Sequence, residues 1–302
     1  MQILTNPGWK DYELLDSGDG MRYELFGPYR TIRPDPQAIW QPSLPKIDWQ
    51  EADVRFQRTT QDKGKWLFKR HLPEKWLMSW NNLSFWVRLT SFKHTGVFPE
   101  QSMQWEFIQS MIDGRRLMLE KKSQESNIQN PTSTISVLNL FGYTGIASIA
   151  ASSAGAKVTH VDASKPSITW ARDNQIASKL QDKPIRWILD DAGKFVEREI
   201  KRGNKYDAII MDPPIYGHGP TGQIWKFSED FPRLLKNCAQ ILSYQPLFVI
   251  VNAYAISSSA LMLGNVMTSY LPKGKIEVGE LTLQETISKR LLSTGIYARL
   301  TF

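Results

Sequence analysis

Cysteine is nearly absent from the sequence, which has one, Cys238, among 302 residues. A single cysteine excludes an intramolecular disulfide and a zinc site built from several cysteines, and it favours a reducing compartment. The four histidines are scattered along the chain without the spacing of metal ligands. We therefore expect neither a disulfide framework nor a bound metal.

Long apolar runs are also missing, and we expect no secretion signal. The stretch from Asn237 to Pro272 has no charged residue, but polar residues and Pro246 interrupt it. No window of about 18 consecutive apolar residues therefore exists. The N-terminus, Met1-Gln2-Ile3-Leu4, has neither the basic start nor the apolar core of a secretion signal. We expect a cytoplasmic protein with no membrane partner.

Basic residues are in modest excess, with 37 Lys and Arg against 30 Asp and Glu, a net charge of +7 and a pI near 9.3. The excess is spread along the chain rather than gathered in a tail. It favours a polyanionic partner such as nucleic acid, although a basic protein kept soluble by its charge would have the same composition. The 41% of hydrophobic residues is typical of a globular protein and excludes a disordered or coiled-coil chain.

The first hundred residues differ from the rest, because they hold seven of the eleven Trp and eight of the seventeen Pro. Turn signals such as Asp16-Ser17-Gly18-Asp19-Gly20 separate short strand-like runs. The predicted strands are Tyr12–Leu15, Arg22–Phe26, Val54–Gln57, Lys65–Phe68 and Leu83–Leu89. This pattern predicts a small β-rich domain over residues 1–98, in whose core the aromatic side chains pack.

From Glu100 onward the pattern changes. Apolar residues at helical spacing predict an amphipathic helix over 100–121, and the polar stretch Ser123–Thr134 predicts a loop. Strands then alternate with helices. The predicted strands are Ile135–Leu140, Val158–Asp162, Ile185–Asp190, Ala208–Met211 and Leu247–Val251. The predicted helices are Ile146–Ser153, Pro166–Ser178, Gly193–Arg202, Phe231–Leu242 and Ser257–Tyr270.

Apolar strands that alternate with helices indicate a parallel sheet covered on both faces. Two closing strands, Glu280–Glu285 and Gly295–Phe302, follow at the end of the chain. We therefore expect an α/β fold in which a doubly wound, mostly parallel sheet of seven strands forms a second domain over residues 99–302.

A turn containing two glycines follows the first strand of this second domain, with the sequence Asn139-Leu140-Phe141-Gly142-Tyr143-Thr144-Gly145. Gly142 and Gly145 allow the backbone to approach a ligand at the N-terminus of the next helix. Asp162 ends the next strand, where a carboxylate can accept hydrogen bonds from both hydroxyls of a ribose. The turn and Asp162 together are stronger evidence for a ligand with a ribose than either feature is alone.

Two later strands also end in acidic residues. Asp191 can read an adenine edge, and it can also cap the following helix. The other strand is followed by Asp212-Pro213-Pro214-Ile215-Tyr216. The prolines stiffen this loop and leave their carbonyls without partners, so that an amine can donate to Asp212 and to a proline carbonyl while Tyr216 offers a stacking face. Open parallel sheets bind ligands at this edge.

These signals together resemble the class I S-adenosylmethionine-dependent methyltransferases. A closer resemblance is to the bacterial 23S ribosomal RNA methyltransferases with an Asp-Pro-Pro-x-aromatic motif. The first loop of that family reads Phe-x-Tyr-Thr-Gly, which matches Phe141 to Gly145, and its Lys-Thr-Gly-x-Phe segment is similar to Lys93-His94-Thr95-Gly96-Val97-Phe98 with one residue inserted. The resemblance covers residues 93–302.

The resemblance implies S-adenosylmethionine as the cofactor and a base of ribosomal RNA as the substrate. It implies that the residues holding the cofactor are Gln101, Asn139, Phe141, Gly142, Tyr143, Gly145, Asp162, Asp191 and Ala192. It implies that the residues acting on the acceptor are Asp212, Pro213, Pro214 and Tyr216. In amine methyltransferases the aromatic residue follows the second proline directly, whereas Ile215 stands there in this chain, which weakens the assignment of an exocyclic amine.

Cys238 bears on a different acceptor. Methylation at C5 of a pyrimidine needs a thiolate that first attacks the ring. Cys238 shares a helical face with Phe231, Leu234 and Leu235, which predicts a place in the core. We therefore disfavour a reaction at C5.

Two other functions stay open from the sequence alone. One is a methyltransferase that acts on a Gln or Lys side chain of a protein, and the other is a catalytically inactive scaffold that binds the cofactor and RNA. A hydride-transferring enzyme is disfavoured, since the turn lacks the full Gly-x-Gly-x-x-Gly. The sequence determines neither the acceptor atom, the target nucleotide nor the oligomeric state, and substrate capture by the small domain is an expectation.

Overall fold

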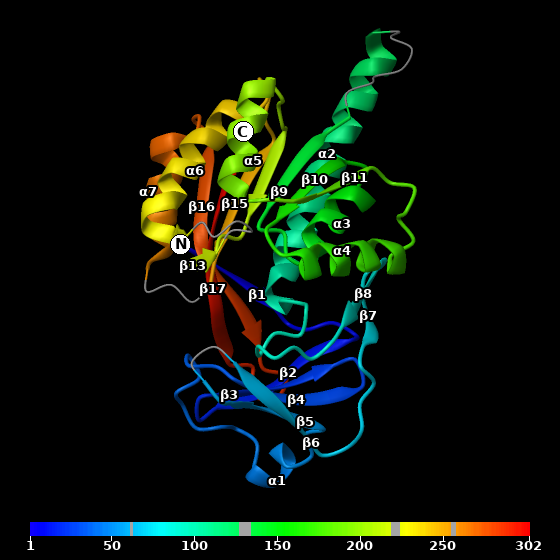
Figure 1. Cartoon of the computed structure of the whole chain (residues 1–302), viewed down its shortest axis with the longest axis vertical. Coiled ribbons are helices and arrows are strands. Elements are labelled where there is room, and N and C mark those ends of the chain that lie inside the picture. Colours follow the sequence, from blue (N-terminus) through cyan, green and yellow to red (C-terminus); the bar gives the residue numbers. More distant parts are fainter. Residues whose placement is uncertain (61–62, 127–133, 219–223, 255–257) are drawn as a thin grey trace. The chain divides into compact units, whose positions relative to one another are not determined.

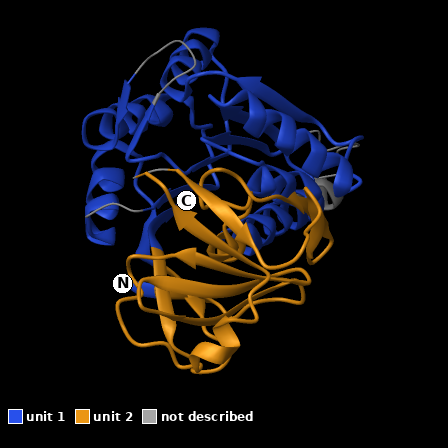
Figure 2. Ribbon diagram, turned by 60° about the horizontal axis from the view of Figure 1, so that its bottom comes forward, with its two compact units in different colours: residues 1–2, 104–280, 295–302 blue, residues 3–103, 281–294 orange. Residues whose placement is uncertain are grey.

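The computed structural model describes residues 1–60, 63–126, 134–218, 224–254 and 258–302 (Figure 1). The chain divides into two compact units, which Figure 2 shows in separate colours. The large unit comprises Met1–Gln2, Gln104–Glu280 and Gly295–Phe302, and the small unit comprises Ile3–Met103 and Leu281–Thr294. The separate domains expected over 1–98 and 99–302 stay a prediction.

The largest sheet has eight strands. In their order across the sheet these are β1 (Gln2–Asn6), β16 (Lys275–Gln284), β17 (Leu291–Thr301), β15 (Phe248–Ala253), β12 (Ala208–Met211), β9 (Ser136–Leu140), β10 (Lys157–Asp162) and β11 (Ile185–Leu189). The run from β15 to β11 is parallel, and β17 pairs with β15 in the antiparallel direction. The mostly parallel sheet is confirmed. It has one strand more than expected, because β1, too polar to be seen as a strand in the sequence, joins one edge.

Helices cover both faces of the parallel strands (Figure 1). They are α2 (Ser102–Ser126), α3 (Ile146–Ser153), α4 (Lys165–Ala177), α5 (Ala192–Arg202), α6 (Phe227–Ile241) and α7 (Ala260–Tyr270). Ile209 and Met211 of β12 pack in one buried cluster with side chains of α5, α6 and α7. Their neighbours Ala208 and Ile210 pack in a second cluster with side chains of α2 and α3. This alternation confirms the doubly wound arrangement.

Two of the predicted segments, Ser123–Thr134 and Ser257–Tyr270, extend beyond the described residues. The stretch Ser123–Thr134 was expected to be a loop, but α2 continues to Ser126, and residues 127–133 lie outside the described part. Residue 257, the expected start of the last helix, also lies outside it. That helix, α7, begins at Ala260, where the hydroxyl of Ser259 accepts a hydrogen bond from the Leu261 amide at 3.1 Å and so caps the first turn. Among the described residues no helix is long and apolar enough to cross a membrane.

The small unit is β-rich, as expected. Its five-stranded sheet has the order β2 (Tyr12–Gly18), β3 (Met21–Phe26), β4 (Tyr29–Pro34), β5 (Val54–Arg58) and β6 (Gly64–Phe68). The other elements are α1 (Lys46–Trp49), the hairpin of β7 (Trp76–Trp80) and β8 (Leu83–Val87), and the 3-10 helix η1 (Pro99–Gln101). Strands β4 and β7 were not predicted. In β4 the buried Arg33 donates to Glu24 of β3 at 2.7 Å, so a charged side chain occupies a core position.

Candidate active site

The loop after β9 has an unusual backbone. Phe141 and Tyr143 have φ values of 56° and 50°, in the left-handed region that non-glycine residues rarely adopt. Such residues cost about 1 kcal/mol each and persist where the surroundings hold them. Gly145, with φ of 80°, then caps α3, and a Cβ there would lie 2.8 Å from Ala171 Cβ. A Cβ on Gly142 would collide with the ring of His160. Both glycines are therefore required by the packing beneath the loop.

Asp162 ends β10 directly beside this loop. Its Oδ2 accepts a hydrogen bond from the Tyr143 amide at 2.8 Å, and its Oδ1 accepts one from the Ser164 amide at 2.8 Å. Burial raises the pKa of Asp162, against the lowering effect of these two amides. Because a carboxylate oxygen can accept two hydrogen bonds, each of the two oxygens still has capacity for a hydroxyl group.

A cavity of about 330 Å³ lies at the ends of four neighbouring parallel strands, in the large unit. The residues that line it are Phe141 after β9, Asp162 to Ser164 after β10, Asp190 to Ala192 after β11, Asp212 and Pro214 after β12, and Val161, Gly217 and Trp225. The structure therefore brings together Phe141, Asp162, Asp191, Ala192, Asp212 and Pro214 of the predicted site.

Asp191 stands at the start of α5, as its helix cap. Its Oδ1 accepts a hydrogen bond from the Lys194 amide at 2.9 Å, which confirms that it caps the helix. Its amide donates to Oδ1 of Asp190 at 2.9 Å, and Asp190 in turn forms an ion pair with Arg198. Since Asp191 and Ala192 also line the cavity, the cap leaves them beside any ligand there.

The Asp-Pro-Pro loop differs from expectation in one respect. The carbonyl of Pro214 is not without a partner, because it accepts a hydrogen bond from the indole Nε1 of Trp225 at 2.6 Å. Among the described residues no donor reaches the carbonyl of Pro213, which is thus the one available to an acceptor amine. Tyr216 is 54% exposed and starts β13 (Tyr216–His218), but it is not among the described residues that line the cavity.

Trp225 is a lining residue that the sequence reasoning missed. It lies in β14 (Ile224–Lys226), which pairs with β13, and its ring centroid is 5.0 Å from that of Phe141. It also lines an adjoining cavity of about 220 Å³ together with Asp191. A tryptophan eleven residues past the Asp-Pro-Pro motif, two residues before α6 begins, was the available signal.

Four of the predicted cofactor residues do not line the cavity but support the loop after β9. Asn139 is buried and donates from Nδ2 to Ser148 Oγ at 2.9 Å, and that hydroxyl lies 2.9 Å from His160 Nδ1. Burial lowers the pKa of His160 to about 3, so this histidine is neutral. Asn139, Gly142, Tyr143 and Gly145 are absent from the described lining of the cavity. Their contacts fix the conformation of the loop that Phe141 belongs to.

Two other predictions concern residues that are not among the described lining of this cavity. Gln101 ends η1 in the small unit, so its cofactor role stays a prediction. Cys238 is fully buried in the core on α6, as expected, and burial raises the pKa of its thiol. Within the described residues no group of three or more His, Cys, Asp or Glu side chains is arranged to hold a metal.

Similarity to a solved structure extends over the whole chain. It is 39% identical to the SAM-dependent methyltransferase of Agrobacterium tumefaciens, with a TM-score of 0.91, covering 100% of this chain and 93% of that one. SMU.776, solved in complex with SAH, is 18% identical with a TM-score of 0.70 and coverages of 96% and 75%, which shows a common fold. No family model matches the chain.

Curated relatives match over part of their length. Ribosomal RNA large subunit methyltransferase K/L of Chromohalobacter salexigens is 26% identical over 211 residues, which are 67% of this chain and 25% of that protein. The protein of the same name from Pseudoalteromonas atlantica is 27% identical over 205 residues, 66% of this chain and 26% of that one. The chain thus spans about a quarter of the length of these relatives.

The residues of the cavity fit S-adenosylmethionine. The half-buried carboxylate of Asp162 has one free acceptor position on each oxygen, which suits the two hydroxyls of a ribose. The cavity is lined by four aspartates and, among the described residues, by no basic side chain, which suits a cationic sulfonium. With near-complete mutual coverage and 39% identity to a solved enzyme, the chain belongs to the S-adenosylmethionine-dependent methyltransferases.

Proposed function

We propose that the chain methylates a base of ribosomal RNA. The observation that carries this proposal is that Asp162 and Asp212, from strands on either side of β9, line one cavity. A site for the ribose of the cofactor is thereby combined with a loop for the acceptor. The names of the curated relatives support RNA as the substrate class.

Four of the cavity residues have a proposed part in holding the cofactor, which supplies an activated methyl group when bound. Asp162 would accept hydrogen bonds from the ribose hydroxyls. Asp191 and Ala192 would border the adenine, and Phe141 would pack against the cofactor from the loop after β9. Asn139, Gly142, Tyr143 and Gly145 would act indirectly, through the conformation of that loop.

The acceptor would be held by the Asp-Pro-Pro loop. An amine nitrogen of the base would donate one hydrogen bond to Asp212 and one to the carbonyl of Pro213. These two bonds would orient the nitrogen lone pair for transfer, so that the contribution of the protein is chiefly positioning. Asp212 or water would take the proton that the nitrogen releases, and Tyr216 would offer a stacking face.

A radiolabelled-methyl assay on total ribosomal RNA, with a cell protein fraction in parallel, tests the proposal. We expect label in RNA from the wild-type chain and an initial rate of labelling at least about a hundredfold lower from Asp212→Ala. Asp182→Ala is the matched control, because Asp182 is exposed and lies outside the cavity lining. Label in protein alone would replace RNA with a protein side chain as substrate, and full activity of Asp212→Ala would remove the proposed role of that residue.

A further inference from the structure

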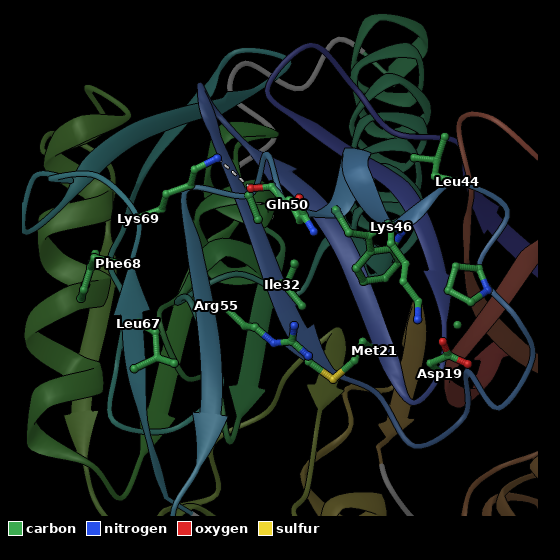
Figure 3. Close-up of a pocket in the computed structure, with 14 residues that line it drawn as sticks. Asp19, Met21, Ile32, Leu44, Lys46, Gln50, Arg55, Leu67, Phe68 and Lys69 are labelled. Atoms are coloured by element: carbon green, nitrogen blue, oxygen red, sulfur yellow. Dashed lines mark hydrogen bonds between the residues drawn. The ribbon is translucent and has the colours of Figure 1, made fainter.

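A second cavity, of about 590 Å³, lies wholly within the small unit (Figure 3). Its apolar walls come from the sheet strands β3, β4 and β6 and from the segment around α1. The side chains that form them are Met21, Ile32, Leu44, Trp49, Leu67 and Phe68. The cavity is thus an apolar recess, partly aromatic, between one face of the small sheet and the segment that crosses it.

The rim of this cavity is formed by the edge of the sheet. β6 is the last strand in the order, and its Leu67 and Phe68 are 43% and 56% exposed. Leu67 pairs across the strands with Arg55 of β5, so a cation and an apolar side chain are neighbours on the same face. In Figure 3 the Arg55 side chain extends across the face of the sheet toward Met21. An exposed apolar edge of this kind marks a surface for a partner.

The charge of the surrounding surface indicates the partner. The hairpin of β5 and β6 carries Arg55, Arg58, Lys63 and Lys65, and none of them has an acidic partner within 4 Å among the described residues. Lys46 in the cavity lining is likewise without one. By contrast, Lys69 pairs with Glu51 and Arg70 with Asp53. The cations of the hairpin are therefore available to a ligand that carries negative charge.

We propose that this cavity and the hairpin beside it bind an unpaired nucleotide of single-stranded RNA. A base enters the cavity against the aromatic side chains of Trp49 and Phe68, while Arg55, Lys65 and Lys46 contact the flanking phosphates. An aromatic surface combined with cations that follow the backbone is the arrangement by which proteins hold single strands. The inference rests on the proposed function, since it names the surface by which the RNA substrate is captured.

The first test measures binding without catalysis. Fluorescence anisotropy follows a labelled single-stranded oligoadenylate of about 12 nucleotides, a length that one small binding domain covers. Removing two cations in Arg55→Gln/Lys65→Gln should lower the slope of log affinity against log salt by about 1.4. Phe68→Ala should weaken binding about tenfold and leave the slope unchanged, because it removes a stacking surface and no charge.

Matched variants control for general effects in the same unit. Lys10→Gln removes an exposed cation outside the hairpin, and Phe92→Ala removes a phenyl ring that is 44% exposed but absent from the cavity lining. Both should bind oligoadenylate like the wild type. Wild-type affinity in the two hairpin variants, or no binding by the wild-type chain, would overturn the inference and leave the apolar recess to a protein partner.

Kinetics distinguish this inference from the proposed function. The double variant should raise KM for ribosomal RNA and leave kcat and the affinity for S-adenosylmethionine unchanged. If the wild-type chain binds oligoadenylate through the hairpin but methylates no RNA, the proposed function fails and the binding surface stands. If RNA is methylated and the double variant has the wild-type KM and salt slope, only the binding surface fails.

Discussion

The cavity of the large unit and that of the small unit are opposite in charge. The cavity of the large unit is lined by four aspartates and, among the described residues, by no basic side chain. The cavity of the small unit is lined by one aspartate, Asp19, and by Lys46, Arg55 and Lys69. Acidic walls favour a cationic sulfonium and repel phosphate, whereas basic walls do the reverse. The difference supports the proposal that cofactor and polyanion bind at separate surfaces, and it predicts that either binding activity can be removed without the other.

The largest expected effect separates chemistry from cofactor binding within the acidic cavity. Asp212→Ala should lower kcat by about a hundredfold or more, because a group that holds the acceptor and its proton is lost. Calorimetry should give an affinity for S-adenosylmethionine within about twofold of wild type. A twofold difference corresponds to about 0.4 kcal/mol, which is within the error of the measurement. A parallel loss of cofactor binding would show that Asp212 serves the cofactor instead.

Asp162→Asn should have the complementary effect. The amide keeps the shape of the side chain but loses the charge-assisted hydrogen bonds to the ribose, which are worth about 1.5–3 kcal/mol. Cofactor affinity should therefore fall about 10- to 100-fold, while oligoadenylate binding by the small unit stays unchanged. Wild-type cofactor affinity in this variant would contradict the assignment of the ribose to Asp162.

A pH dependence tests a property that the two units share. Burial lowers the pKa of His160 in the large unit to about 3, and burial with nearby cations lowers that of His94 in the small unit to about 3. The unfolded state protonates near the ordinary value of 6.5, so as the pH falls it gains protons before the folded state does. Each histidine should therefore lower the free energy of unfolding by about 2 kcal/mol between pH 6.5 and 5.

Denaturant unfolding of wild type and His160→Gln at pH 7 and pH 5 isolates this contribution. The variant should be less stable at pH 7 but should lose less of its stability on acidification. His94→Gln is the matched variant in the small unit. An unchanged loss of stability in His160→Gln would mean that His160 is already protonated in the folded state or is not the group that titrates.

The smallest expected effect concerns the support of the Asp-Pro-Pro loop. Trp225→Phe keeps a ring beside Phe141 but loses the hydrogen bond to the Pro214 carbonyl. A neutral hydrogen bond is worth about 0.5–1.5 kcal/mol, so kcat should fall about fivefold with the cofactor affinity retained. A loss confined to cofactor affinity would instead assign Trp225 to the cofactor alone.

Local sequence pattern predicted the large unit better than the small one. The bounds of α3 and β12 are those predicted. A continuous apolar strand and a short helix are each indicated by the pattern of residues that are adjacent in the sequence. Strand β4 was missed, since its Arg33 is buried against Glu24, nine residues earlier in the chain. Because a charged residue fills this core position, the sequence of the strand lacks the alternation of apolar and polar residues. That Glu24 is the partner of Arg33 becomes known only once the strands are paired.

For the site, residues at strand ends were predictable and residues brought in by a later turn were not. Asp162, Asp191 and Asp212 each follow an apolar strand, so a parallel sheet places them at one edge. Trp225 reaches the cavity through the pairing of β13 with β14, which the sequence did not indicate. Asn139 at the end of β9 and Gly142 in the following loop were predicted to hold the cofactor, and that role stays a prediction, since the contacts they make are with Ser148 and His160 inside the fold.

The hydrogen bond from the Tyr143 amide to Asp162 makes that amide a spectroscopic reporter. Its proton points at a carboxylate oxygen 2.8 Å from the nitrogen, so we expect it to resonate at low field while the carboxylate is charged. Protonation of Asp162, its replacement by Asn or the arrival of a ribose hydroxyl on the same oxygen would each shift this one signal. A single backbone resonance thus follows cofactor occupancy in solution, with no label on the cofactor and no substrate present.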